Sequence, residues 1–182
     1  MENAIVFIDN GYLKLILKEF NNIKIDVKKL SFILCKKLDF WCDSIYFYDA
    51  PPYQNPNSLD DRNRKRSYDK FISKLKENDI IVREGRCQKI GSEFHQKGVD
   101  TLLTMDLLSI PEEKNVTNIV LISCDTDFVP VLNKIREKGL KVYLFHYTDY
   151  KRGSMFSMSN YLDTACDKII LIKKEDLDNS RL

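Results

Sequence analysis

The sequence has few of the residues that build zinc centres or disulfide frameworks. It contains only two histidines, His95 and His146, and its five cysteines are scattered without a C-x-x-C pair. An odd number of isolated cysteines argues against both a disulfide framework and a zinc site. We therefore expect a protein of a reducing compartment, and we place it in the cytoplasm.

The sequence also lacks a long apolar run and an excess of one charge. No uninterrupted apolar stretch approaches the roughly 20 residues that span a bilayer, and the apolar run after Met1–Asn3 is too short for a signal peptide. We expect no membrane partner. The 29 basic and 27 acidic side chains leave a formal net charge of +2, so attraction to nucleic acid requires a local basic patch.

Short β-branched apolar runs alternate with stretches of helical periodicity, which is the pattern of βαβ units. The alternation predicts an α/β fold with a doubly wound, mostly parallel sheet and helices on both faces. We expect one domain over residues 1–172 and a charged tail over residues 173–182 that frays. The expected strands are Ala4–Ile8, Ser44–Tyr48, Ile80–Arg86, Asn118–Ser123, Leu140–Phe145 and Lys168–Ile172.

Between these strands, apolar residues recur at helical spacing, for example at Phe128, Val131, Leu132 and Ile135. Gly139 follows that face and is expected to end the helix in a left-handed turn. Residues 50–58 and 147–159 have the composition of loops, and residues 91–98 look flexible.

Acidic residues follow two of the apolar runs directly. Asp9 comes after the first run, with Asn10 beside it as a neutral oxygen ligand. Asp125 and Asp127 come after the run that ends at Ile122, and in an extended chain they point to the same side. Since ligands of an open parallel sheet bind outside the carboxyl ends of its strands, these acids are expected to meet in one crevice. They would form a site for a hard metal ion.

Each of these groups also has a purely local interpretation. Asn10-Gly11 is a common turn or helix-cap sequence, and Thr126 or Asp127 is able to cap the helix that begins at Phe128. The sequence leaves both interpretations open.

The helix expected after Gly98 carries Asp100 and Asp106. Six residues correspond to a rotation of about 240°, so the two carboxylates cannot both point at one metal ion. Asp100, near the helix start, is the candidate ligand, whereas Asp106 either supports the ligands or is solvated. The local alternative for Asp100 is compensation of the helix dipole.

Three motifs, in this order, resemble the NYN domain, a branch of the PIN-like nuclease superfamily, from Ala4 to about Ile172. They are Phe7-Ile8-Asp9-Asn10, Lys97-Gly98-Val99-Asp100 with Leu102–Leu108, and Ser123–Leu132; residues Ser159–Asp167 also resemble the closing helix of that family. The resemblance implies a PIN-like three-layer fold and a Mg²⁺- or Mn²⁺-dependent nuclease that acts chiefly on RNA. It implies an acidic, metal-binding catalytic site of Asp9, Asp100, Asp125 and Asp127, assisted by Asn10. Cys124 departs from the pattern, because the family usually has glycine there.

Phosphodiester hydrolysis is consistent with such a site. The reaction requires an activated water and neutralisation of charge on the phosphate and the leaving oxygen, and one or two metal ions supply both. No protein nucleophile is needed. His95, in the segment before Asp100, either contacts the substrate or donates a proton, or it is an ordinary exposed histidine.

Basic residues suggest where a substrate would bind. Arg62, Arg66, Lys70 and Lys74 recur every four residues and form a stripe that drifts by only about 40° per step on a helix. Lys97 precedes the acidic helix, and Lys151 with Arg152 lies among Tyr147, Tyr150 and Phe156 in a loop where rings could stack on bases. The alternatives are a solvated amphipathic helix and an ordinary surface loop.

The resulting hypothesis is an endoribonuclease that cleaves single-stranded or structured RNA, tRNA included. DNA as a substrate and assembly into a homo-oligomer stay open. The main alternative is a catalytically weak or inactive NYN-fold module that binds RNA or regulates a partner. A receiver-like phosphotransfer domain is disfavoured, because Asp9-Asn10-Gly11-Tyr12 lacks a second acid two residues after the first.

Overall fold

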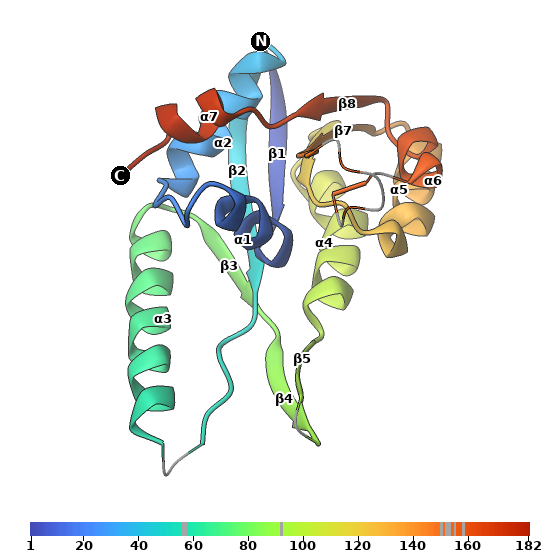
Figure 1. The fold of residues 1–182 in the computed structure, drawn as a ribbon. Coiled ribbons are helices and arrows are strands. Elements are labelled where there is room, and N and C mark those ends of the chain that lie inside the picture. Colours follow the sequence, from blue (N-terminus) through green and yellow to red (C-terminus); the bar gives the residue numbers. More distant parts are fainter. Residues whose placement is uncertain (56–57, 92, 150, 152–153, 155, 158) are drawn as a thin grey trace.

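A parallel sheet of six strands forms the centre of the protein (Figure 1). The computed structural model describes residues 1–55, 58–91, 93–149, 151, 154, 156–157 and 159–182. The strand order is β3-β2-β1-β6-β7-β8, and all the pairs are parallel. The strands are β1 (Glu2–Asp9), β2 (Phe40–Asp49), β3 (Ile81–Glu84), β6 (Asn118–Ile122), β7 (Lys141–His146) and β8 (Lys168–Leu171).

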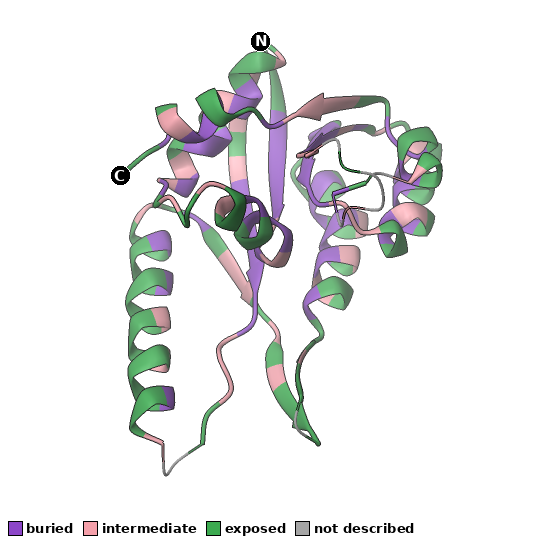
Figure 2. Cartoon of the chain, in the orientation of Figure 1, coloured by how far each residue is buried: buried purple, intermediate pink, exposed green. Residues whose placement is uncertain are grey.

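Helices cover both faces of this sheet, which confirms the predicted doubly wound α/β fold. The helices α1 (Asn10–Glu19), α2 (Val27–Lys37), α3 (Leu59–Glu77) and α7 (Lys174–Asn179) pack on one face, and α4 (Val99–Glu113), α5 (Val129–Glu137) and α6 (Asn160–Thr164) pack on the other. Alternate side chains of β1 enter the two cores: Val6 belongs to the first and Phe7 to the second. The apolar centre of β1 is therefore buried on both sides (Figure 2).

The strand order reverses between β1 and β6. The chain moves outward from β1 through β2 to β3, returns to the other side of β1 at β6, and then moves outward again. In such folds the crevice for ligands lies at the carboxyl ends of the two strands where the order switches. Ile8 pairs with Ile122, so Asp9 and Ser123 leave the sheet at the same level.

The expected strand Ile80–Arg86 is divided between two sheets. It breaks at Gly85, where an added Cβ would lie 2.6 Å from the carbonyl oxygen of Lys97. The chain then forms an antiparallel hairpin of β4 (Arg86–Ile90) and β5 (Glu93–Lys97). The segment that looks flexible in the sequence, residues 91–98, thus contains the strand β5.

The expectation of a frayed tail is also wrong. Residues 174–179 form α7, and its Leu177 is fully buried in the first core. Lys37 Nζ lies 2.5 Å from a carboxylate oxygen of Asp176, and the amide of Asp26 donates a hydrogen bond of 2.7 Å to the carbonyl of Ser180. The tail thus closes over α2.

Three segments extend beyond the carboxyl ends of the strands: residues 50–55, the first turns of α3, and the β4–β5 hairpin (Figure 1). The hairpin and the first turns of α3 are largely exposed, whereas residues 50–53 are buried or half-buried (Figure 2). In the described part of the chain, no helix is both long enough and apolar enough to cross a bilayer.

Candidate functional site

The four predicted acids lie at the end of the molecule where the strand order switches. Asp9 is the last residue of β1, Asp125 and Asp127 follow β6, and Asp100 lies in the first turn of α4. Asp9 caps α1: its Oδ1 accepts a hydrogen bond of 3.3 Å from the amide of Tyr12, and its Oδ2 accepts one of 3.2 Å from Ser123 Oγ. The cap of α1 is thus Asp9 and not Asn10.

Ser123 also connects Asp9 to the acids that follow β6. Its Oγ accepts a hydrogen bond of 3.2 Å from the amide of Asp125. Asp125 in turn caps the short helix η1 (Thr126–Phe128) by accepting a bond of 2.9 Å from the amide of Asp127. The expectation that Thr126 or Asp127 is the cap is wrong. Asp127 stands within η1 and is exposed.

The carboxylates influence one another electrostatically. Burial raises the pKa of Asp9 above its ordinary value, and the charge of Asp100 raises it further, although hydrogen bonds from Tyr12 and Ser123 partly oppose the shift. Burial also raises the pKa of Asp100, together with the charges of Asp125 and Asp127. These carboxylates carry like charges and repel one another. A bound cation would relieve this repulsion.

The thiol of Cys124 experiences the same field. Burial, with the charges of Asp9 and Asp125, raises its pKa to about 11. Burial and the neighbouring carboxylates therefore disfavour the thiolate form of Cys124 at neutral pH.

The side chains at this site are of the kind that bind a hard cation. Within the described ranges, no group of three or more His, Cys, Asp or Glu side chains is arranged to hold a metal ion. The four predicted side chains nevertheless offer carboxylate oxygens from separate elements, which are the ligands that Mg²⁺ and Mn²⁺ take. Two of them, Asp9 and Asp125, accept hydrogen bonds from helix amino termini through one oxygen each, which leaves lone pairs of both carboxylates for a cation.

Asn10 belongs to a neighbouring polar group that the sequence did not reveal. It is buried, and its Nδ2 donates a hydrogen bond of 2.6 Å to Asp49 Oδ2. Asp49 is fully buried and also accepts bonds of 3.0 and 2.9 Å from Lys14 Nζ. The signal for Asp49 was available, since it directly follows the apolar run of β2 just as Asp9 follows β1.

Asp106 does not join the acids. It is buried and accepts a hydrogen bond of 2.8 Å from the hydroxyl of Tyr48. It also forms a two-pronged ion pair with Arg83, with both nitrogen–oxygen distances at 2.7 Å. The expectation that Asp106 supports the ligands or is solvated is therefore wrong, because Asp106 joins α4 to the edge strand β3.

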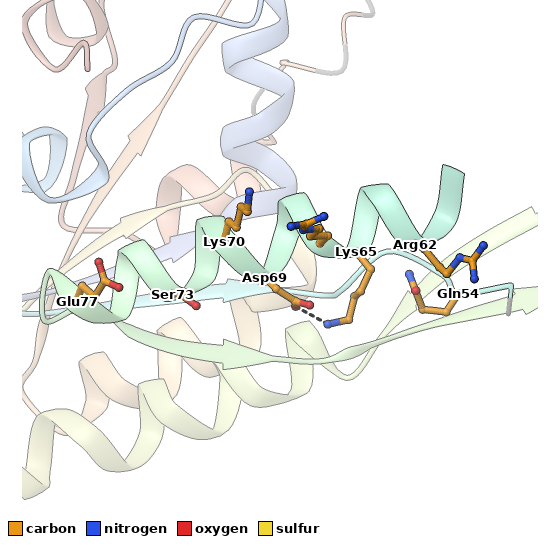
Figure 3. A pocket seen from close by; sticks show the side chains of 8 residues that line it. Gln54, Arg62, Lys65, Asp69, Lys70, Ser73 and Glu77 are labelled. Carbon is orange, nitrogen blue, oxygen red and sulfur yellow. Dashed lines mark hydrogen bonds and ion pairs between the residues drawn. The ribbon is translucent and has the colours of Figure 1, made fainter. Parts of the chain in front are cut away.

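The four residues of the basic stripe are exposed on α3. At 100° per residue they lie on the side opposite to the buried Ile72 and Leu75. Three of them, Arg62, Arg66 and Lys70, line a groove of about 560 Å³ that includes Gln54 and Lys65 (Figure 3). Lys74, the fourth, is exposed beyond that lining.

The other candidates for substrate binding are dispersed. Lys97 is exposed at the end of β5, and His95 lies on the same strand with its Nε2 3.4 Å from a carboxylate oxygen of Glu93. Lys151 is exposed, with its Nζ 3.7 Å from a carboxylate oxygen of Asp149. Arg152 lies outside the described residues.

Comparison with known proteins gives a family and a fold. The NYN domain family model matches residues 3–173. A solved protein of unknown function from Vibrio parahaemolyticus has a similar fold, with a TM-score of 0.66 and 17% identity over 100% of this chain and 96% of that one. A proposed UDP-N-acetylglucosamine 2-epimerase from Listeria monocytogenes matches at a TM-score of 0.47, with 10% identity over 98% of this chain and 41% of that one. This likeness is too weak to interpret. No curated protein sequence matches.

Proposed function

The chain belongs to the NYN domain family, a branch of the PIN-like nuclease superfamily, and we propose that it is a Mg²⁺- or Mn²⁺-dependent endoribonuclease. One observation carries the proposal. Asp9, Asp100, Asp125 and Asp127 come from β1, α4 and the segment after β6 to the switch point of the sheet, where the pKa of Asp9 and that of Asp100 are raised. Such raised values in a group of carboxylates are a mark of functional sites.

The carboxylates would hold the cation, and neighbouring groups would orient them. A bound divalent cation supplies an activated water and neutralises charge on the phosphate and the leaving oxygen. Ser123 hydrogen-bonds to Asp9 and to the amide of Asp125, so it fixes the relative position of the two strand ends. Such supporting hydrogen bonds orient metal ligands in proteins.

The basic stripe on α3 would bind RNA away from the acids. Arg62, Arg66 and Lys70 line the outer groove of α3, and Lys65 beside them is paired with Asp69 (Figure 3). Phosphates bound there would belong to a distant part of a long or structured RNA, and this contribution to binding would weaken as the salt concentration rises.

The alternative function is an RNA-binding module with weak or no catalysis. It is favoured by one observation, namely that the carboxylates of the described residues do not already form a three-ligand group. The crowding of four acids argues against it, because a protein without metal chemistry gains nothing from their mutual repulsion.

The test is cleavage of labelled tRNA, single-stranded RNA and single-stranded DNA in the presence of Mn²⁺, Mg²⁺ or a chelator. We expect metal-dependent cleavage of RNA by the wild-type protein and a loss of more than about 100-fold in Asp125→Asn, since even residues that only support metal ligands contribute up to that factor. Asparagine keeps the ability to cap η1, so the variant should fold.

The opposite result would favour the alternative function. If neither protein cleaves any substrate while both bind RNA with equal affinity, the nuclease proposal fails. Cleavage that persists in the chelator, or in Asp125→Asn at the wild-type rate, would refute the metal site.

A further inference from the structure

A second groove lies on the side of α3 that faces the hairpin. It has a volume of about 530 Å³, and four segments line it: α1, residues 50–52, α3 and the β4–β5 hairpin. Among the lining residues are Lys14, Pro51, Arg64, Tyr68 and Gln96. These residues differ from those of the outer groove in Figure 3, so α3 separates two distinct surfaces.

One end of this groove adjoins the acids. A methyl group added at Gly11 would stand 3.1 Å from Asp9 Oδ1 and 4.0 Å from Gln96 Oε1. Gln96 Oε1 and Asp9 Oδ1 are therefore at most about 7 Å apart (3.1 Å plus 4.0 Å), on either side of Gly11. A strand lying in the groove would have a direct path to the proposed reaction site.

The face of the hairpin that lines the groove continues to an exposed aromatic ring. In the hairpin, Cys87 pairs with Gln96 and Lys89 pairs with Phe94, so these four side chains share one face. Phe94 is two residues from Gln96, roughly 7 Å along the strand. It keeps 55% of its surface exposed. Tyr53 supports it from residues 50–55, with the ring centroids 5.1 Å apart, and Lys89 Nζ lies 5.8 Å from the ring centroid.

We propose that Phe94 is a stacking platform for an unpaired base, and that the nucleic-acid strand runs from this ring through the groove to the acids. Phe94 lies beside Tyr53 and Lys89 and keeps more than half of its surface exposed, and the flat face of an exposed aromatic ring accepts any base. Paired bases are stacked within a helix and cannot offer that face. The substrate class is therefore a single strand, and the base on Phe94 belongs to a nucleotide close to the scissile phosphate. The position of that phosphate rests on the proposed nuclease function, whereas the stacking itself does not.

The charges of the groove indicate that stacking contributes more than phosphate contacts. Lys14 is already paired with the buried Asp49 at 2.9 Å, and Arg64 is paired with Asp61. Few uncompensated cations remain to release counterions from a phosphate backbone. Binding in this groove should therefore depend less on salt than binding to the basic stripe.

The test measures binding without cleavage. A short fluorescein-labelled single-stranded RNA is titrated in the presence of a chelator with the wild-type protein, Phe94→Ala, Phe94→Tyr and the control Phe32→Ala. Phe32 is an exposed phenylalanine on α2, outside the groove. We expect about tenfold weaker binding for Phe94→Ala, and wild-type affinity for Phe94→Tyr and Phe32→Ala, because a stacked base contributes roughly that factor.

A scan with abasic nucleotides identifies the stacked base. Removing one particular base should weaken binding to the wild-type protein but not to Phe94→Ala, because the pair of changes removes a single contact. Phe94→Trp provides a direct signal: the RNA should quench its fluorescence more than that of the wild-type protein, whose single tryptophan is Trp41 at the amino end of β2.

The outcomes separate this inference from the nuclease proposal. Loss of binding in Phe94→Ala supports the platform even if no cleavage is found under any condition. If the wild-type protein cleaves RNA but Phe94→Ala binds and cleaves like it, the platform is refuted and the nuclease proposal stands. An abasic scan that affects both proteins equally, or an unquenched Phe94→Trp, would also overturn the inference.

Discussion

Helix α4 carries two carboxylates six residues apart that lie in opposite electrostatic environments. Asp100, in the first turn, faces other carboxylates, and Asp125 and Asp127 raise its pKa. Asp106 is buried but paired, with Arg83 at 2.7 Å and the hydroxyl of Tyr48 at 2.8 Å. One end of the helix therefore presents unpaired negative charge at the switch point, and its middle joins the sheet edge through an ion pair.

The difference shows how to separate acids that serve a site from acids that hold the fold. A carboxylate whose partners are cations and hydroxyls lowers the energy of the folded protein as it stands. A carboxylate whose neighbours are carboxylates raises the energy of the folded protein as long as no cation is bound. The two regions should therefore respond in opposite directions when their charge is removed.

The largest effect on stability is expected from Asp106→Ala. This change leaves the buried hydroxyl of Tyr48 without its acceptor and removes the partner of Arg83. We expect a loss of about 2 kcal/mol in the free energy of unfolding, less than for a fully buried pair because the side chain of Arg83 is 42% exposed. Chemical denaturation measures it.

The matched variant Asp106→Asn keeps an acceptor for Tyr48 and should lose less. If Asp106→Ala were as stable as the wild-type protein, Asp106 would behave like a solvated acid. The contrast between Asp106 and Asp100 would then not hold.

A smaller effect of the opposite sign is expected from Asp9→Asn without metal. Asparagine is as good a helix cap as aspartate, and the change removes a carboxylate that burial and Asp100 disfavour. We expect a gain of about 1 kcal/mol in the free energy of unfolding at neutral pH, measured by denaturation in a chelator.

The pH dependence of this gain follows from the raised pKa. Because the folded protein holds the proton of Asp9 more tightly than the unfolded chain, the ionised carboxylate costs stability above the carboxyl range. The advantage of Asp9→Asn should therefore be complete at pH 7 and should shrink as the pH falls toward 3.8, the ordinary value. A destabilised Asp9→Asn, or a gain that grows on acidification, would contradict the account.

The sequence predicted the parts of the fold and site that depend on local pattern. Apolar runs followed by acids located Asp9 and Asp125 at strand ends, and Gly139 was expected in the left-handed turn after α5, where its φ is +87°. The sheet order then brings those strand ends together. The different surroundings of Asp100 and Asp106 also followed in part from their angular separation on one helix.

The remaining features depend on contacts between distant segments. Nothing local shows that Gly85 must break a strand to make room for Lys97, or that Leu177 finds a buried position against the first core. Arg83 is 23 residues from Asp106 in sequence, so periodicity could not connect them. Asp49 differs from these cases, because its place directly after the apolar run of β2 was a local signal in the sequence.

The most direct test of the central claim is calorimetric titration of Mn²⁺ into the wild-type protein, Asp100→Asn and Asp106→Asn. The two variants remove one charge each from the same helix. We predict saturable binding to the wild-type protein, binding at least about tenfold weaker in Asp100→Asn, and unchanged binding in Asp106→Asn. Identical isotherms for all three proteins, or no binding to the wild-type protein, would contradict the assignment of these acids to a metal site.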